Sequence, residues 1–266
     1  MNMYLHELMS LRKSTIIWTC TMIAVAALYF SIYPSIAADA ADFTQLLSGY
    51  PAPVRAALGI SLNNITSLLG FYSMVFSLIT LCGAIQAMNF GVSILSREVR
   101  ERTADFLLVK PVSRPAIVSA KLLAAVTMLL STNVFYYAAA FMLASIVKNE
   151  DYSVKLFLLI NLTLFFIQMM FLAIGVLISV FFIKLKSVLP ISLGSVFGFY
   201  IMGALIATGT NDMERFISPF KYFDISYIMK YASFDTPYLL TGAAIVVVAI
   251  SLSYAIYSKK DIQPVS

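Results

Sequence analysis

The fold of this chain is decided by residues 156–183, which read L-F-L-L-I-N-L-T-L-F-F-I-Q-M-M-F-L-A-I-G-V-L-I-S-V-F-F-I and contain no Asp, Glu, Lys or Arg. A helix needs roughly 20 consecutive apolar residues to cross the hydrocarbon core of a bilayer. Strands of a membrane barrel would instead alternate between apolar and polar residues over about ten positions. The stretch therefore predicts a transmembrane helix.

Five further charge-free intervals extend this prediction to the whole chain. They are residues 14–38, 56–96, 122–147, 187–211 and 236–258, in a sequence that is 61% hydrophobic and 12% charged. Such a composition leaves too little polar surface to cover a water-soluble globule. We predict an all-α membrane protein that forms one domain over residues 1–266, with six spans at about residues 14–36, 68–95, 118–147, 155–183, 187–209 and 237–258.

Basic residues predict the orientation of the spans, because loops on the cytoplasmic side retain Lys and Arg. With the N-terminus inside, the inside segments carry twice as many basic residues as the outside segments. The inside set is Arg12, Lys13, Arg97, Arg100, Arg102, Lys110, Arg114, Lys121, Lys184, Lys186, Lys259 and Lys260, and the outside set is Arg55, Lys148, Lys155, Arg215, Lys221 and Lys230. We therefore expect a multi-pass protein of the cell membrane with both termini in the cytoplasm.

The segments that flank the spans are also amphipathic or aromatic. Residues 2–13 place Tyr4, Leu5, Leu8 and Met9 at helical spacing, which predicts an interfacial helix before the first span; a frayed tail is the alternative. Residues 208–238 are rich in Phe and Tyr, which prefer the headgroup level of a bilayer. Short helices against the outer face are expected there.

Several classes of chemistry are disfavoured by what the sequence lacks. No ionisable residue lies near the centre of a predicted span, although ion-coupled carriers and intramembrane enzymes need such residues at their sites. The chain also has no G-x-x-x-x-G-K-[ST] loop for the phosphates of ATP. We expect no catalytic residue and no metal site in this chain, and if nucleotide drives it, the ATPase is a separate subunit.

Uncharged polar residues and glycines occur within the spans. Hydrogen bonding between helices is the favoured interpretation of the amides, and lining of a substrate path is the alternative. These amides are Gln86, Asn89, Asn133, Asn161 and Gln168. Gly194 and Gly198 have the G-x-x-x-G spacing that lets two helices approach closely, which is typical of a subunit contact but also of glycine-rich membrane helices in general.

The connection between the second and third spans carries the strongest functional pattern. It reads S-R-E-V-R-E-R-T-A-D-F-L-L-V-K-P-V-S-R-P from Ser96 to Pro115. Glu98, Arg102 and Asp105 can share one face of a helix, and residues 106–109 are apolar within a charged surrounding. Such a surface is typical of docking onto a protein. An anchor that touches lipid headgroups is the alternative, but lipid attraction explains neither the acidic nor the apolar residues.

Taken in order, these residues resemble the permease subunits of type 2 ATP-binding-cassette (ABC) exporters. In that family the corresponding loop carries an acidic residue, a Thr after a small residue, an apolar run and a Pro-(Val or Ile)-Ser-Arg turn. Here these are Glu98, Thr103, Phe106 to Val109 and Pro111 to Arg114, and Arg102 stands where the family often has Gly. The stretches S-P-F-K-Y-F-D at residues 218–224 and K-K-D-I at residues 259–262 are similar as well.

The resemblance implies the partners and the roles of the residues. Residues 97–110, which we call the docking segment, would form a cytoplasmic coupling helix received by an ABC ATPase that binds ATP and Mg²⁺. The implied ATPase-coupling residues are Arg97, Glu98, Glu101, Arg102, Thr103, Phe106, Leu107, Lys110, Pro111 and Arg114. Two ATPase copies and a homodimer, or a dimer with a similar permease, are implied, with Gly194 and Gly198 consistent with the dimer contact.

We accordingly expect the chain to be the permease subunit of an ATP-driven exporter in a bacterial plasma membrane. Aromatic and Met side chains without fixed charge favour a hydrophobic or amphipathic substrate such as a peptide, toxin or antibiotic. A membrane anchor or regulator of an ATPase that transports nothing is the alternative. No nucleic-acid partner is expected.

Overall fold

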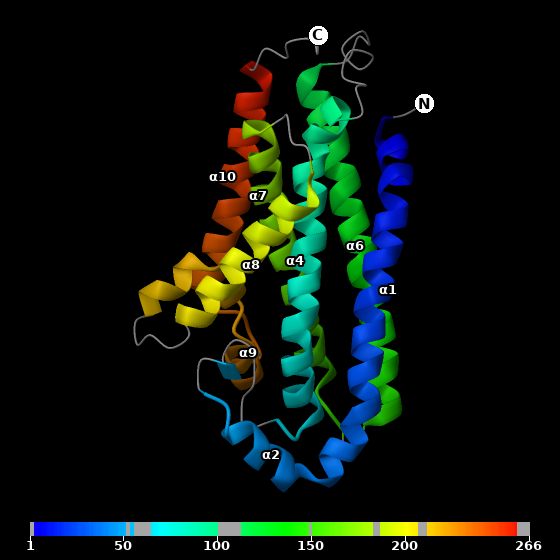
Figure 1. Ribbon diagram of the computed structural model, residues 1–266, viewed down its shortest axis with the longest axis vertical. Helices are drawn as coiled ribbons and strands as arrows, with labels where there is room; N and C mark the ends of the chain where they lie inside the picture. The colour runs from blue at the N-terminus through cyan, green and yellow to red at the C-terminus, as the bar shows by residue number, and fades with distance from the viewer. Residues whose placement is uncertain are drawn as a thin grey trace.

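Helices make up the protein. The computed structural model describes residues 3–51, 54–55, 65–100, 113–148, 151–182, 187–206 and 212–259, and within these ranges every regular element is helical (Figure 1). The elements are α1 (Met3–Ala38), α2 (Ala40–Ser48), α4 (Leu68–Arg100), α6 (Arg114–Val147), α7 (Val154–Phe181), α8 (Leu189–Ile206), the 3-10 helices η1 (Asp212–Ile217) and η2 (Pro219–Lys221), α9 (Ile225–Tyr231) and α10 (Thr236–Lys259). The prediction of an all-α protein is confirmed.

Five of these helices are long and apolar enough to cross a membrane, namely α1, α4, α6, α7 and α10. Each contains most of one predicted span, although α1 begins 11 residues earlier than predicted and α4 ends five residues later. The remaining predicted span, at residues 187–209, corresponds to α8, which is only 18 residues long and therefore about 27 Å from end to end. Six crossings remain a prediction, while a multi-pass membrane protein is confirmed.

The predicted helix at residues 2–13 is continuous with the first span, and its interfacial position stays a prediction. Residues 3–38 form one continuous helix of 36 residues, about 54 Å long and so longer than the roughly 30 Å of hydrocarbon. The first turns of this helix pack against α6. The hydroxyls of Tyr4 and Thr127 share a hydrogen bond of 3.0 Å.

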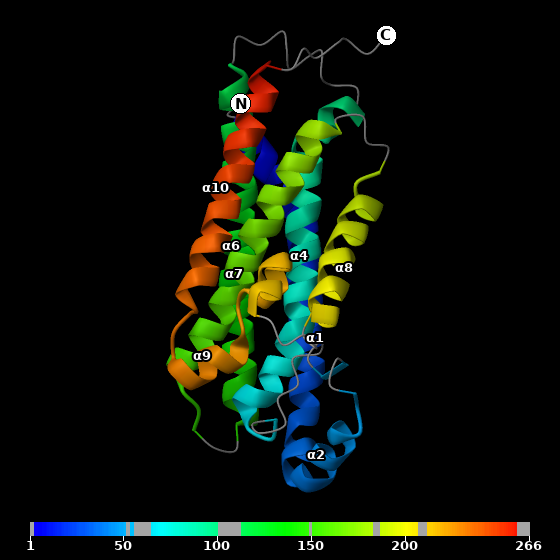
Figure 2. The same ribbon diagram turned by 90° about the vertical axis from the view of Figure 1, so that its left-hand side faces the viewer.

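The ends of the helices define two ends of the bundle. At one end, which we call the terminal end, α1 begins and α10 ends, at the top of Figure 1. The other end, which we call the distal end, carries α2 and the passage from α6 to α7 (Figures 1 and 2). Since α4 ends and α6 begins at the terminal end, the docking segment joins two helices there.

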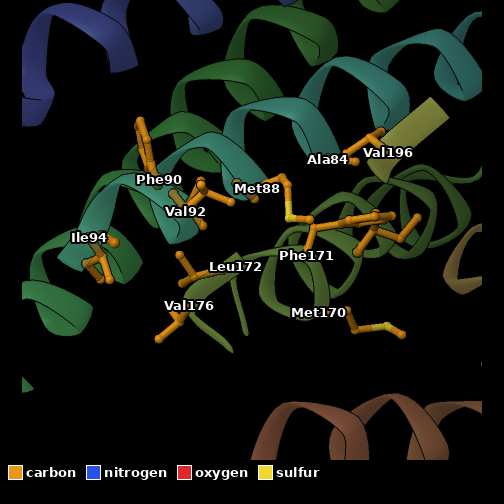
Figure 3. Close-up of a cluster of buried hydrophobic side chains, with 14 of the residues drawn as sticks. Ala84, Met88, Phe90, Val92, Ile94, Met170, Phe171, Leu172, Val176 and Val196 are labelled. Carbon is orange, nitrogen blue, oxygen red and sulfur yellow. The ribbon is translucent and has the colours of Figure 1, made fainter. Parts of the chain in front are cut away.

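The core is built around α4 and α7. In their apolar segments α4 and α7 are 67% and 61% buried, whereas α1 and α10 are only 28% and 17% buried. Figure 3 shows side chains of α4, such as Met88 and Val92, beside Phe171 and Val176 of α7. The contact is close because Gly91 and Gly175 face each other's helix, where a methyl group on Gly175 would lie 2.8 Å from the carbonyl oxygen of Met88.

Short helices follow α8, as predicted for the aromatic segment 208–238, and they pack against the bundle; their position at the outer face stays a prediction. Ser218 donates a 2.7 Å hydrogen bond to the carbonyl oxygen of Phe199 in α8. Arg215 lies 4.2 Å from the ring centroid of Tyr238 and 3.7 Å from a carboxylate oxygen of Asp235. These contacts hold Ser218 against α8 and η1 against the start of α10. Burial in this layer lowers the pKa of Lys221.

Candidate coupling site at the terminal end of the bundle

The ends of α4 and α6 frame the predicted coupling site. Arg97 and Glu98 lie in the last turn of α4, and Arg114 is the first residue of α6, where it is half-buried. The other predicted coupling residues lie outside the described residues, and so does the predicted coupling helix. They are Glu101, Arg102, Thr103, Phe106, Leu107, Lys110 and Pro111.

Helix α4 continues past its predicted end at residue 95. It runs to Arg100, so Arg97 and Glu98 belong to the same helix as the span. A continuous helix moves as a stiff rod, because each residue beyond the first turn is tied to residue i−4 by a backbone hydrogen bond. A displacement applied at Glu98 is therefore passed along α4 into the core.

The start of α6 follows from its sequence. Ser113 is extended with a ψ of 145°, and Pro115 lies in the first turn. Proline is tolerated there because the first backbone N–H groups of a helix have no partner inside the helix. Helix α6 therefore begins at Arg114, four residues before the predicted start of the third span at residue 118.

Two turns into α6, Lys121 is the centre of a buried polar contact. Its side chain is 2% exposed and lies 3.3 Å from Glu7 of α1, whose side chain is 14% exposed. The same ammonium donates a 2.8 Å hydrogen bond to the carbonyl oxygen of Ile94 in α4. The sequence indicated Lys121 only as one more basic residue for orientation. Its position at the edge of a charge-free run was a signal, but nothing in the sequence pointed to Glu7 as its partner.

Other polar contacts surround Lys121. Ser119 of α6 and Tyr254 of α10 share a hydrogen bond of 2.7 Å between their hydroxyls. Together with the contact between Tyr4 and Thr127, these contacts tie the first turns of α6 to α1, α4 and α10. Helix α6, which follows the docking segment, is thus held to three neighbouring helices by polar contacts near its start.

A comparison with protein-family models gives the class of protein. Residues 1–262 match the model of the ABC-2 family transporter proteins. The chain belongs to the ABC-2 transporter family. The resemblance found in the sequence is thereby confirmed, and the protein is a membrane-spanning permease of an ABC transporter, which associates with an ABC ATPase. A comparison with curated proteins found no match.

The amides within the spans of this ABC-2 permease form a buried network across four helices. Gln86 of α4 donates to the hydroxyl of Thr132 in α6 at 3.0 Å, and Thr132 also accepts from Thr19 of α1 at 3.1 Å. Gln168 of α7 donates to Gln86 at 3.1 Å and accepts from Asn133 at 2.6 Å. Hydrogen bonding between helices is confirmed for these amides.

The remaining two amides differ from each other. Asn161 of α7 is buried and accepts a 2.8 Å hydrogen bond from the hydroxyl of Tyr72 in α4, so it also joins two helices. Asn89 of α4 is half-buried, and no hydrogen bond joins it to another helix in the part of the chain that the structure describes. For Asn89 the lining of a substrate path stays a prediction.

The predicted dimer contact lies on an open face of α8. A methyl group added at Gly194 or at Gly198 would meet no atom within 4 Å. Nearby, Phe197 and Ile201 are exposed by 42% and 55%. The described chain therefore leaves this face of α8 uncovered, and the contact with a second copy stays a prediction.

Proposed function

We propose that this ABC-2 permease is the membrane subunit of an ATP-driven exporter, and that it is moved by an ATPase bound to the docking segment. The observation that supports this most is the family match over residues 1–262. It is supported further by the position of the segment, which joins the buried helix α4 to the helix that is fastened to three neighbours. A pull at this position acts on the core directly.

The terminal end of the bundle would face the cytoplasm of a bacterial cell. The basic residues support this orientation, since Lys and Arg are retained on the cytoplasmic side. The end that carries the docking segment is the same end at which α1 begins and α10 ends. Both termini would then lie on the side where ATP is available.

The working assembly would contain two permease copies, identical or similar, and two ATPase subunits. ATP and Mg²⁺ would bind to the ATPase alone, because this chain has no phosphate-binding loop motif. Closure of the ATPase pair would displace both docking segments. The attached helices α4 and α6 would then shift a central path between two states.

The substrate would be hydrophobic or amphipathic, such as a peptide, toxin or antibiotic. Large apolar side chains remain exposed on the open face of α8, among them Phe197, Ile201 and Met202. A photoreactive phenylalanine analogue at position 197 tests this in membranes. Labelling of a hydrophobic peptide that excess unlabelled peptide suppresses is the expected result, whereas labelling of glycans alone would exclude this substrate class.

Reconstitution with the ATPase that co-purifies with the chain tests the function itself. Uptake of a fluorescent hydrophobic peptide and ATP hydrolysis are measured for the wild type, Glu98→Arg and the double variant Phe106→Asp, Leu107→Asp. Both variants should insert normally but lose ATP-driven uptake by about tenfold or more, the equivalent of ~1.4 kcal/mol or more in coupling. Asp151→Arg is the matched charge reversal at the distal end, where the side chain is 94% exposed, and should behave as the wild type.

Two outcomes would contradict the proposal. Normal ATP-driven uptake in both variants would exclude the docking role of residues 97–110. ATPase binding without any transport in the wild type, over a range of hydrophobic peptides, would favour the alternative of a membrane anchor or regulator.

A further inference from the structure

Lys121 and Glu7 form an unusual contact for a membrane helix bundle. With a side chain that is 2% exposed, Lys121 is the only buried charged residue in the part of the chain that the structure describes. It meets Glu7 at 3.3 Å and the carbonyl oxygen of Ile94 at 2.8 Å. Three helices, α1, α4 and α6, thus meet at one ammonium group.

Stability alone does not account well for such a contact. Desolvation of a buried ion pair offsets most of its attraction, so an apolar pair of similar volume is often as stabilising. An apolar pair does not fix the relative position of two helices, because packing permits them to slide. A charged hydrogen bond holds a defined geometry. The contact is therefore suited to keeping α1 in register with α4 and α6.

The placement of the contact connects it to the docking segment on both sides. Ile94 precedes Arg97 by less than one helical turn, and Lys121 lies two turns after Arg114. A displaced docking segment therefore moves both the ammonium and the carbonyl that binds it. Glu7 belongs to a different helix, α1, which has no covalent connection to the docking segment near this end.

We propose that the ion pair between Glu7 and Lys121 is the positioning contact that makes the first turns of α1 follow the docking segment when the ATPase moves it. The inference rests on the proposed function, because it requires an ATPase that moves residues 97–110. The hydrogen bond between Tyr4 and Thr127 supports the same contact between α1 and α6, three residues from Glu7 and six residues from Lys121. Helix α1 then shifts with α4 and α6 as one body.

Spin labels on α1 and α6 measure this directly. Met9 and Leu123 are 48% and 58% exposed and lie near the contact, so both are changed to Cys in a chain whose Cys20 and Cys82 are changed to Ala. The distance between the labels is measured in the complex with the ATPase, without nucleotide and with nucleotide trapped by vanadate. In the otherwise unchanged chain, the distance distribution should be the same in both states.

The variants separate a directional contact from packing. In Glu7→Gln, and in the double variant Glu7→Met, Lys121→Met, the distribution should shift or broaden on trapping, while ATPase binding is retained. The control Lys148→Met, Asp151→Asn removes an exposed ion pair at the other end of α6 and should leave the distribution unchanged. Glu7→Asp keeps the charge and should restore most of the wild-type behaviour.

Three results would overturn the inference. A shift in the wild type on trapping means that α1 moves separately, and an unchanged distribution in both Glu7 variants means that packing alone is sufficient. If the wild type does not bind an ATPase at all, then the proposed function fails and this inference fails with it, and that outcome is distinguished by the absence of a complex.

Discussion

The contact between α4 and α7 and the open face of α8 both carry glycines, but the glycines meet different surroundings. A methyl group at Gly91 would collide with the carbonyl oxygen of Leu172 and lie 2.8 Å from the backbone nitrogen of Val176, whereas at Gly194 or Gly198 it would meet nothing within 4 Å. Only Gly194 and Gly198 have the G-x-x-x-G spacing noted in the sequence. Close approach within one chain is thus made by glycines that belong to no motif, and the motif itself lies on a face left open.

The largest expected effect breaks the closed contact. Gly91→Ala forces two backbones apart, because the obstructing atoms of Leu172 and Val176 belong to the main chain and cannot rotate away. We expect a loss of about 3 kcal/mol in the free energy of unfolding, at the upper end for an overpacked core. Unfolding in mixed detergent micelles measures it. The same change at Gly194 is the control, and an equal midpoint for both variants would contradict the comparison.

A smaller effect is expected at Gly83, where the obstacle is a side chain. A methyl group there meets the end of Leu164 and lies 3.1 Å from the amide nitrogen of Gln168. Because Leu164 can change rotamer, Gly83→Ala should cost about 1 to 2 kcal/mol, again measured by unfolding in micelles. If Gly83→Ala lowers the free energy of unfolding more than Gly91→Ala does, then contact with the backbone does not determine which substitution is more destabilising.

Polar contacts in the same part of the bundle should matter less than its backbone contacts. Gln168→Leu removes the hydrogen bonds to Gln86 and Asn133. Interhelical hydrogen bonds in membranes contribute about 0.6 kcal/mol on average, so a loss of roughly 1 kcal/mol is expected. A double-mutant cycle with Gln86→Leu isolates their interaction. A coupling energy of zero would mean that the network does not act as a unit.

The smallest effect on the single chain is expected on the open face. Gly194→Leu and Gly198→Leu add side chains where no atom of the described chain is near, so unfolding should change by less than about 0.5 kcal/mol. Association of two copies, measured by cross-linking in vesicles, should weaken if this face is the dimer contact. Unchanged association would remove the two glycines from the proposed interface, while a large loss of stability would contradict the open face itself.

Part of the site was accessible to sequence reasoning and part was not. Arg97 and Glu98 were predicted to lie in the connection after the second span, whereas they form the last turn of α4, and Arg114 begins α6. Their role in coupling stays a prediction. The sequence predicted that Gln86 and Gln168 would each form a hydrogen bond between helices, but it did not predict that they would pair with each other. Lys121 was seen as a topology residue, since nothing in the sequence states which residue of α1 lies across from it.

The sequence by itself determined the class of the fold and the approximate bounds of the helices. Lipid offers no hydrogen bonds to the backbone, so long apolar stretches must be helical, and α7 lies within two residues of its predicted span at each end. Only the tertiary structure decided which helix faces meet, as at Gly91 and Gly175. It also showed that residues 3–13 and the first predicted span form one continuous helix. In a bilayer the buried face and the lipid-facing face of a helix are both apolar, and hydrophobic periodicity therefore does not tell one from the other.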